Sequence, residues 1–197
     1  MTTGARELDV AGAFEFSRTS FRDDRGMFAT PFDAESFAAA VGRPLFSLSQ
    51  VCVSRSRRGV LRGVHFTATP PGRAKYAYCP QGSAYDIVVD LRVGSPTFGR
   101  HEVLRLGPDP VNAVYFPPGV GHAFVALEDD TVMCYLLAGG YVPADELAVS
   151  PFDPRLGLPL PTDLTLVLSD RDRAAPTLAE AEAAGILPRH ADCLEWG

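Results

Sequence analysis

The chain has 197 residues, of which 46% are hydrophobic and 21% are charged, and its formal net charge is −6. This length and apolar content suffice for a substantial core and fit one domain over residues 1–197 better than two. The acidic balance argues against a nucleic-acid partner, although a local basic pocket for a phosphate stays possible. No apolar run approaches the ~20 residues of a membrane span, so we expect no membrane partner.

The ends of the chain and its cysteines indicate the compartment. Residues 1–7 contain no apolar segment followed by a cleavage site, so we expect a cytoplasmic protein. The four cysteines are widely spaced and form no CxxC pair, and they are Cys52, Cys79, Cys134 and Cys193. In a reducing compartment we expect them to be free thiols that act as buried small hydrophobes.

The predicted elements begin with a helix and continue as strands. Asp33–Val41 is predicted to be helical, with Asp33 as N-cap and Gly42 as the stop. Seven short segments rich in Val, Tyr, Phe and Ile then follow, separated by Gly and Pro. They are Phe46–Ser54, Ala74–Cys79, Tyr85–Leu91, Glu102–Leu106, Asn112–Phe116, Ala123–Leu127 and Thr131–Leu137. This spacing is typical of an all-β antiparallel sandwich or jelly roll.

The last predicted element is a second helix near the C-terminus, at about residues 177–185. Thr177 and Glu180 have the spacing of a capping box, and Gly185 should end the helix. The expected chain is therefore one β domain with a few peripheral helices.

Three stretches carry polar residues into segments that should face a core: 59–66, 117–124 and 168–172. The pattern Pro117-x-Gly119-x-x-His122 resembles the second half of the cupin signature, which belongs to a β jelly-roll barrel. Of the histidines expected in the first half of that signature, this chain has only His65. Two histidines make a poor metal site, because such sites usually take three or four protein ligands, so we expect no metal.

Arg62, His65 and Lys75 are predicted to lie near one sheet. Taken singly, each has an ordinary structural explanation: a salt-bridge arginine, a hydrogen-bonded core histidine and a solvated lysine. Together they suit a phosphorylated or enolisable substrate. The arginine offers a fork for phosphate oxygens, the histidine a base near neutral pH, and the lysine a positive charge for a developing enolate.

These motifs identify a family. The chain resembles the dTDP-4-dehydrorhamnose 3,5-epimerases and their relatives in antibiotic deoxysugar pathways, from residues 21–26 to residues 169–172. The most specific stretches are 60–66, 89–99 and 118–124. The resemblance implies a cupin-type jelly roll (a double-stranded β-helix), a dTDP-linked 4-keto-6-deoxyhexose as substrate, no redox cofactor or metal, and a homodimer.

The resemblance also implies four catalytic roles. His65 matches the base, and Asp172 matches the carboxylate that orients it. Lys75 matches the lysine that faces the C4 oxygen, and Tyr135 matches the acid on the opposite face of the sugar. The chemistry agrees, because a C–H bond beside a ketone needs a base together with stabilisation of the oxyanion. A tyrosine with an ordinary pKa of ~10 is protonated at neutral pH, as an acid must be.

The substrate-binding residues implied by the resemblance come from several segments. The diphosphate or nucleoside would be contacted by Arg25, Gln50, Arg62 and Arg171. Tyr141 would stack on thymine, His122 and Glu146 would occupy further binding positions, and Asp86 would be a supporting carboxylate near the base.

The sequence favours inversion at C3 alone, as in some antibiotic-pathway relatives. A full 3,5-epimerase and a 5-epimerase remain alternatives. A 3,4-ketoisomerase would share the fold and the nucleotide pocket, but inversion needs Tyr135 opposite His65. A non-catalytic sugar-binding cupin would tolerate loss of the His65–Asp172 pair, and both residues are present.

Overall fold

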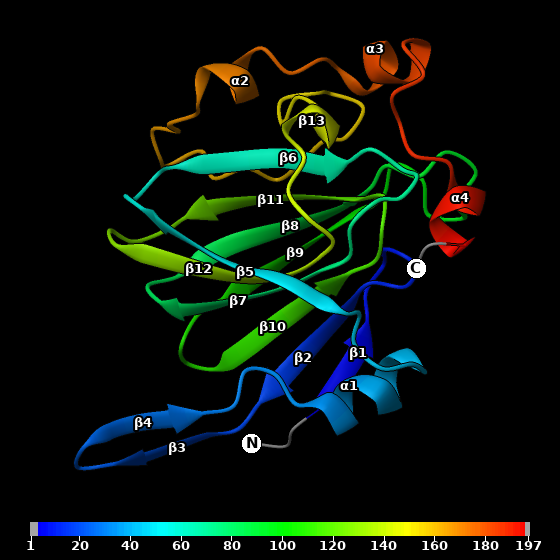
Figure 1. Cartoon of the computed structure of the whole chain (residues 1–197). Helices are drawn as coiled ribbons and strands as arrows, with labels where there is room; N and C mark the ends of the chain where they lie inside the picture. Colours follow the sequence, from blue (N-terminus) through cyan, green and yellow to red (C-terminus); the bar gives the residue numbers. More distant parts are fainter. Residues whose placement is uncertain (1–3, 196–197) are drawn as a thin grey trace.

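Two antiparallel sheets dominate the computed structural model, which describes residues 4–195 (Figure 1). The six-stranded sheet has the order β1 (Gly4–Glu7), β2 (Phe14–Arg18), β10 (Val111–Phe116), β7 (Lys75–Gln81), β12 (Thr131–Ala138), β5 (Leu48–Ser56). The five-stranded sheet has the order β13 (Glu146–Ala148), β6 (Leu61–Thr67), β11 (Val120–Ala126), β8 (Ala84–Asp90), β9 (His101–Leu106). A hairpin of β3 (Ser20–Asp23) and β4 (Gly26–Ala29) projects from the body. The predicted all-β class is confirmed.

The helices are short and peripheral. They are α1 (Ala34–Val41), a 3₁₀ turn η1 (Pro143–Asp145), α2 (Asp170–Arg173), α3 (Leu178–Ala183) and α4 (His190–Glu195). Asp33 caps α1 by accepting from the Ser36 N–H at 2.9 Å, and Gly42 ends it with a φ of 80°. The capping box predicted at Thr177 and Glu180 is also present. Between residues 4 and 195 no helix is long and apolar enough to cross a membrane.

The sequence prediction missed several strands. Those at the N-terminus, β1, β3 and β4, are almost wholly exposed and lack the alternating apolar pattern of a half-buried strand. The polar stretch 168–172 was expected to interrupt a strand, but most of it forms the single turn of α2, capped by Ser169. Strand β6 falls within the stretch 59–66, which was expected to face a core, but its bounds were not predicted because its apolar alternation breaks at Gly63.

Three apolar clusters stack across the two sheets. The first fills the space between them and includes Phe116, Phe124 and Met133. The second lies on the outer face of the five-stranded sheet, where the C-terminal segment with Leu168 and Leu178 covers it. The third lies on the outer face of the six-stranded sheet beneath α1. The C-terminal segment is thereby packed along β6, which brings residues 167–173 beside the strand that carries His65.

The stretch 89–99 forms a buried cage around one carboxylate. Asp90 is fully buried and accepts hydrogen bonds from Arg92 Nη2 at 2.7 Å, Ser95 Oγ at 2.6 Å and Thr97 Oγ1 at 2.5 Å. Burial alone would raise the pKa of Asp90, but these donors hold it below its ordinary value. The motif that helped to identify the family therefore fixes the turn between β8 and β9.

A β-bulge in β6 decides which of its side chains face the space between the sheets. In the pairing of β6 with β11, His65 lies opposite His122 and Arg62 lies opposite Phe124, so β6 contains one extra residue. The side chains of Leu61, Val64 and Phe66 all pack in the outer cluster. Arg62 and His65, three residues apart, consequently share the inner face, which regular alternation would forbid.

Glycine at position 63 makes the bulge possible. Its φ is +120°, and a Cβ there would lie 2.5 Å from the His122 carbonyl oxygen and 2.6 Å from Ala123 Cα. Both contacts are to backbone atoms of the paired strand, so neither can be relieved by turning a flexible side chain.

Gly63→Ala is expected to lower the free energy of unfolding by about 3 kcal/mol or more, because strain at a positive φ adds to an overpacked contact. Urea denaturation measures the change. Gly4→Ala is the matched control, since nothing lies within 4 Å of a Cβ there. Equal stability of Gly63→Ala and the parent protein would contradict the proposed constraint.

Candidate active site

A central cavity of about 410 Å³ opens between the two sheets. Its walls come from β5, β6, β7, β11, β12 and residues 141–146, and it is lined by Cys52, Ser54, Arg62, His65, Arg73, Lys75, His122, Phe124, Tyr135, Leu137, Tyr141 and Glu146. All but five of these were predicted as site residues. Sequence reasoning missed Cys52, Ser54, Arg73, Phe124 and Leu137.

His65 and Asp172 form a hydrogen-bonded pair at this cavity. His65 Nε2 lies 2.7 Å from Asp172 Oδ1, and the Asp172 side chain is only 4% exposed. The turn of α2 holds the carboxylate, because the Ser169 hydroxyl accepts from the Asp172 N–H at 3.1 Å. Burial would raise the pKa of Asp172, but hydrogen bonds from His65, Ser169 and Gly63, with the charge of His65, hold it below its ordinary value. Asp172 is thus set to remain a carboxylate facing the imidazole.

A second His–Asp pair lies next to the first. His122 Nε2 is 2.6 Å from Asp86 Oδ2, and Asp86 is fully buried. Asp86, predicted as a supporting carboxylate near the base, therefore bonds to His122 and not to His65 itself. Strand order explains this, because β11, which carries His122, lies between β6 and β8.

Tyr135 lies on the opposite wall, on β12 of the six-stranded sheet. Its ring packs edge-to-face on His122, with centroids 5.9 Å apart. Burial, reinforced by the negative charge of Asp86, raises the pKa of Tyr135 well above its ordinary value. The phenol is therefore protonated at neutral pH and can act as a proton donor.

Lys75 stands at the start of β7, on the same sheet as Tyr135. Burial lowers its pKa below the ordinary value; the Glu146 carboxylate opposes this shift, whereas Arg73 and Arg171 add to it. Cationic groups inside a cavity are suited to stabilising an oxyanion.

Arg73 organises one end of the cavity, and its side chain is only 5% exposed. It donates to Glu146 Oε1 and to Gln50 Oε1, both at 2.8 Å, and to the carbonyl oxygens of Ala138 and Gly139. Gln50 and Glu146, two predicted binding residues, are therefore held by a third that the sequence did not single out. A buried arginine that donates to four acceptors fixes the positions of the groups it contacts, so Arg73 is a positioning residue.

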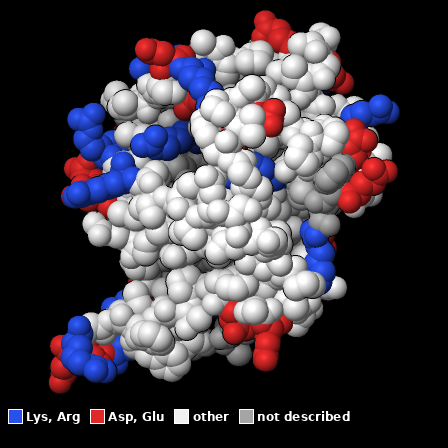
Figure 2. All heavy atoms as spheres, in the orientation of Figure 1, with Lys and Arg blue, Asp and Glu red and all other residues white. Residues whose placement is uncertain are grey.

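Basic side chains continue beyond the cavity. An adjoining hollow of about 330 Å³ shares Arg62 and His65 with it and adds Arg171 and Asp172. Arg171 is fixed by donating to the Glu146 carbonyl oxygen at 2.6 Å. In Figure 2, Lys and Arg side chains gather at the upper left, over the region of α2 and the ends of β5 and β6. Two guanidinium groups beside one hollow suit a diphosphate.

Two predicted binding residues, Tyr141 and Arg25, lie at the margin of the cavity and outside it. Tyr141 lines the cavity with 58% of its surface exposed. Arg25 is not brought to the cavity. It lies in the β3–β4 hairpin, where it pairs with Asp23 at 2.5 Å.

The cysteines are free thiols, as expected, but their burial was predicted only in part. Cys79 and Cys193 are buried, Cys134 is half-buried, and Cys52 is exposed on the edge strand β5. The expectation for Cys52 is wrong because β5 has no neighbouring strand on its outer side. In the described chain no three His, Cys, Asp or Glu residues are placed to hold a metal ion together.

A paired imidazole on one wall, a protonated phenol on the other and an ammonium group beside them are the side chains that an acid–base isomerase needs.

Comparison with known proteins supports the same class. The family model for dTDP-4-dehydrorhamnose 3,5-epimerase matches residues 7–180. The chain belongs to this family, as its sequence motifs predicted.

Relatives within the family include enzymes of two specificities. The dTDP-4-dehydrorhamnose 3,5-epimerase of Mycolicibacterium smegmatis is 47% identical over 189 residues, covering 96% of this chain and 92% of the relative. The dTDP-4-dehydro-6-deoxyglucose 3-epimerase of Streptomyces bikiniensis is 46% identical over 183 residues, covering 93% of each.

The fold also matches that of solved structures in this family. The crystal structure of a 4-keto-6-deoxy sugar epimerase from the novobiocin biosynthetic gene cluster of Streptomyces spheroides superposes with a TM-score of 0.93 at 46% identity. The match covers 98% of this chain and 96% of that one. The predicted cupin-type epimerase fold is confirmed.

The Arg73–Glu146 pair is expected to be strongly coupled. In a double-mutant cycle of Arg73→Met and Glu146→Gln, followed by urea denaturation, we expect a coupling free energy of about 1–3 kcal/mol, since each single change leaves a buried partner unpaired. The pair Arg155–Glu182, about half exposed, is the control and should couple by less than about 1 kcal/mol. Additive effects at Arg73 and Glu146 would rule out the positioning role.

Proposed function

We propose that this chain inverts C3 of a dTDP-linked 4-keto-6-deoxyhexose, by removing the proton beside the ketone and returning one to the opposite face. The observation that carries the proposal is that His65 and Tyr135 face one cavity from different sheets. Inversion needs a base and an acid on opposite sides of the same carbon, and this arrangement supplies them.

His65 is the base. Its Nε2 is committed to Asp172, which leaves Nδ1 to take the proton. When the ring becomes an imidazolium, the Asp172 carboxylate stabilises the new charge and keeps the ring in place. The carboxylate itself stays ionised.

Lys75 and Tyr135 complete the step. As the C–H bond breaks, negative charge moves to the C4 oxygen, and the Lys75 ammonium stabilises the resulting enolate. Tyr135 then delivers its phenolic proton to the other face of the planar carbon. A ketoisomerase would need no donor on that second wall, so the position of Tyr135 favours epimerisation.

The nucleotide would be recognised by the residues around the cavity mouth. Arg62 and Arg171 offer two guanidinium forks to the diphosphate, and Gln50, held by Arg73, would contact the nucleotide. Tyr141 has the exposed ring that stacking on thymine requires. His122 supports Tyr135 from beneath, with Asp86 fixing its ring.

The choice of C3 rests on the family. The relatives include 3-epimerases of Streptomyces bikiniensis and Streptomyces niveus, an epimerase from the novobiocin biosynthetic gene cluster and a 3,5-epimerase, and the same proposed acid–base residues serve either outcome. Since the cavity draws on residues from 50 to 172, we infer that the chain works as one domain. Four free thiols accord with a cytoplasmic enzyme.

Isotope exchange tests the proposal. The protein incubated with dTDP-4-keto-6-deoxyglucose in deuterated water should incorporate deuterium at C3 and yield the inverted product, as followed by NMR. Exchange at C5 as well would indicate the 3,5-epimerase, and no exchange at either carbon would refute the epimerase.

Two variants separate the proton transfers. His65→Ala should abolish exchange, with a loss of at least about 10³-fold, because the base is gone. Tyr135→Phe should impair inversion more than exchange, since His65 can still remove the proton and return a deuteron to the same face. Equal and complete loss of exchange in both variants would contradict this division of roles.

The alkaline side of the pH profile should report Lys75. Because the Lys75 pKa is lowered, activity should fall as pH rises through a value below its ordinary 10.5. The Glu146 charge raises that pKa, so Glu146→Gln should move the fall to lower pH. Glu182→Gln, on the exposed surface, should leave it in place. A profile unmoved by Glu146→Gln would refute the assignment to Lys75.

We further propose that the enzyme is a homodimer. The edge strand β5 exposes Leu48, Val51 and Val53 by 51%, 61% and 64%, and the β3–β4 hairpin exposes Phe21 and Phe28 by 66% and 69%. Figure 2 shows the middle of the face over β5 free of charged side chains. A second copy would cover this apolar surface and end the unpaired edge. A hairpin reaching across would also account for Arg25 as a contact in the partner's cavity.

Sedimentation tests the dimer. The parent protein should sediment as a dimer, and Val53→Asp should shift it toward the monomer, because a charge on the buried edge costs desolvation. Phe152→Asp is the control, since Phe152 is also exposed, by 56%, but lies away from β5. A parent protein that remains a monomer at high concentration would refute the homodimer.

A further inference from the structure

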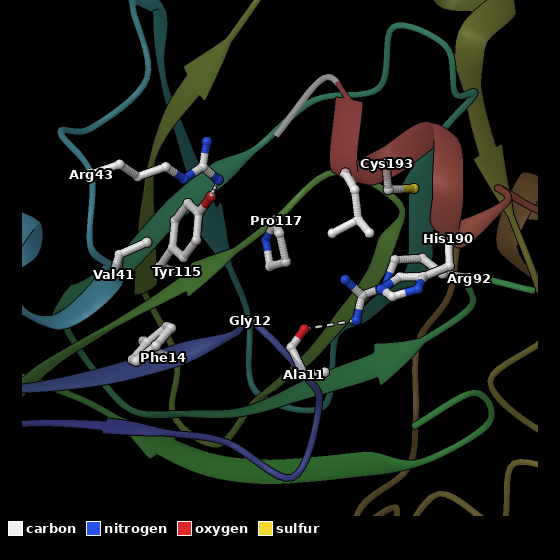
Figure 3. A pocket seen from close by; sticks show the side chains of 11 residues that line it. Ala11, Gly12, Phe14, Val41, Arg43, Arg92, Tyr115, Pro117, His190 and Cys193 are labelled. Atoms are coloured by element: carbon white, nitrogen blue, oxygen red, sulfur yellow. Dashed lines mark hydrogen bonds between the residues drawn. The ribbon is translucent and has the colours of Figure 1, made fainter. Parts of the chain in front are cut away.

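A second cavity, of about 320 Å³, lies outside the space between the sheets (Figure 3). It is enclosed by α4, by the turn between β1 and β2, and by the residues that follow α1. None of the side chains proposed for catalysis or for nucleotide binding lines it. The reaction therefore leaves this outer cavity unexplained.

One side of the outer cavity presents two linked donors. Arg43 Nη2 donates to the Tyr115 hydroxyl oxygen at 2.8 Å, so the phenolic hydrogen of Tyr115 is left for another acceptor. Burial raises the pKa of Tyr115, with Arg43 and Arg92 opposing, so the phenol stays protonated. No carboxylate pairs with Arg43 among the ion pairs found in residues 4–195.

The other side presents a second guanidinium group. Arg92 is 3% exposed; its Nε and Nη2 are held by Asp90, and Nη2 also donates to the Ala11 carbonyl oxygen at 2.7 Å. Nη1 takes no part in these bonds. Figure 3 shows Arg43 and Tyr115 on one side of the cavity, Arg92 and His190 on the other, and Pro117 between them.

The remaining surface of the outer cavity is apolar. Phe14, Val41, Pro117 and Leu194 contribute side chains, and none of the described lining residues is Asp or Glu. The charge of Arg92 is paired with Asp90, so the preference of this cavity for an anion comes from the Arg43 guanidinium, which makes no ion pair within residues 4–195, and from the Tyr115 hydroxyl. The apolar walls and a volume near the lower end of ligand pockets call for a small organic molecule rather than a bare ion.

We propose that the outer cavity binds a small organic anion, a carboxylate or phosphate monoester carrying one ring or a short hydrocarbon body. The anionic group is held by Arg43 and the Tyr115 hydroxyl, while Arg92, paired with Asp90, forms the far side of the cavity. The body lies on Pro117 and against Phe14 and Val41. Neither the reaction nor the nucleotide is needed for this binding.

Calorimetric titration of the full chain with four probes tests the site. Benzoate and phenyl phosphate should bind saturably, with a Kd below about 1 mM. Benzamide has the ring without the charge, and inorganic phosphate has the charge without the ring, so both should bind at least about tenfold more weakly. Saturating dTDP should not displace benzoate.

Variants locate the binding. Arg43→Gln, at a half-exposed position that tolerates the change, should weaken benzoate binding at least about tenfold. Tyr115→Phe should weaken it without removing the ring from the core. Arg155→Gln is the control and should bind like the parent protein.

Several results would overturn the proposal. These are no saturable binding of either aromatic anion, displacement of benzoate by dTDP, unchanged affinity in Arg43→Gln, or inorganic phosphate binding as tightly as phenyl phosphate.

Discussion

The close approach of Gly63 to the β11 backbone is the constraint on which the active site depends. Without a side chain at position 63, β6 can hold one extra residue against β11, and its inner and outer faces exchange beyond that point. Leu61, Val64 and Phe66 stay in the outer cluster, while Arg62 and His65 both face the cavity. The proposed phosphate-binding arginine and the proposed base thus lie on one face, three residues apart. A regular strand would have buried one of them in the core.

Buried pairs then hold each reactive group in place. Asp172 fixes His65, Asp86 fixes His122 beneath Tyr135, and Arg73 fixes Glu146 and Gln50. Removing a partner from such a pair leaves a charge with little water around it, which is costly. These partners fix the orientation of His65, His122, Glu146 and Gln50, and fixed orientation is what the proposed proton transfers from opposite walls require.

Much of this could be predicted from the sequence. Turn residues and alternating segments indicated the β class, and capping residues located α1 and α3. The stretches 60–66, 89–99 and 118–124 identified the family. These features are local, or are carried by a resemblance, and need no knowledge of which strands are neighbours.

The remaining features depend on contacts between distant segments. The partner of Asp86, His122, was not predicted because it depends on β11 lying between β6 and β8. Arg73 was overlooked because its acceptors come from residues 50, 138, 139 and 146. The bounds of strand β6 were not predicted because its bulge removes the alternation that reveals strands. Arg25 lies away from the cavity of its own chain, so its predicted role requires a second copy.

The tautomer of His65 tests the central claim most directly. In protein labelled with ¹⁵N-histidine, at a pH where the ring is neutral, NMR should find the proton of His65 on Nε2, bonded to Asp172, and Nδ1 unprotonated. The signature of that hydrogen bond should vanish in Asp172→Asn. A proton found on Nδ1 would contradict the account, because the nitrogen left for the substrate could then accept no proton.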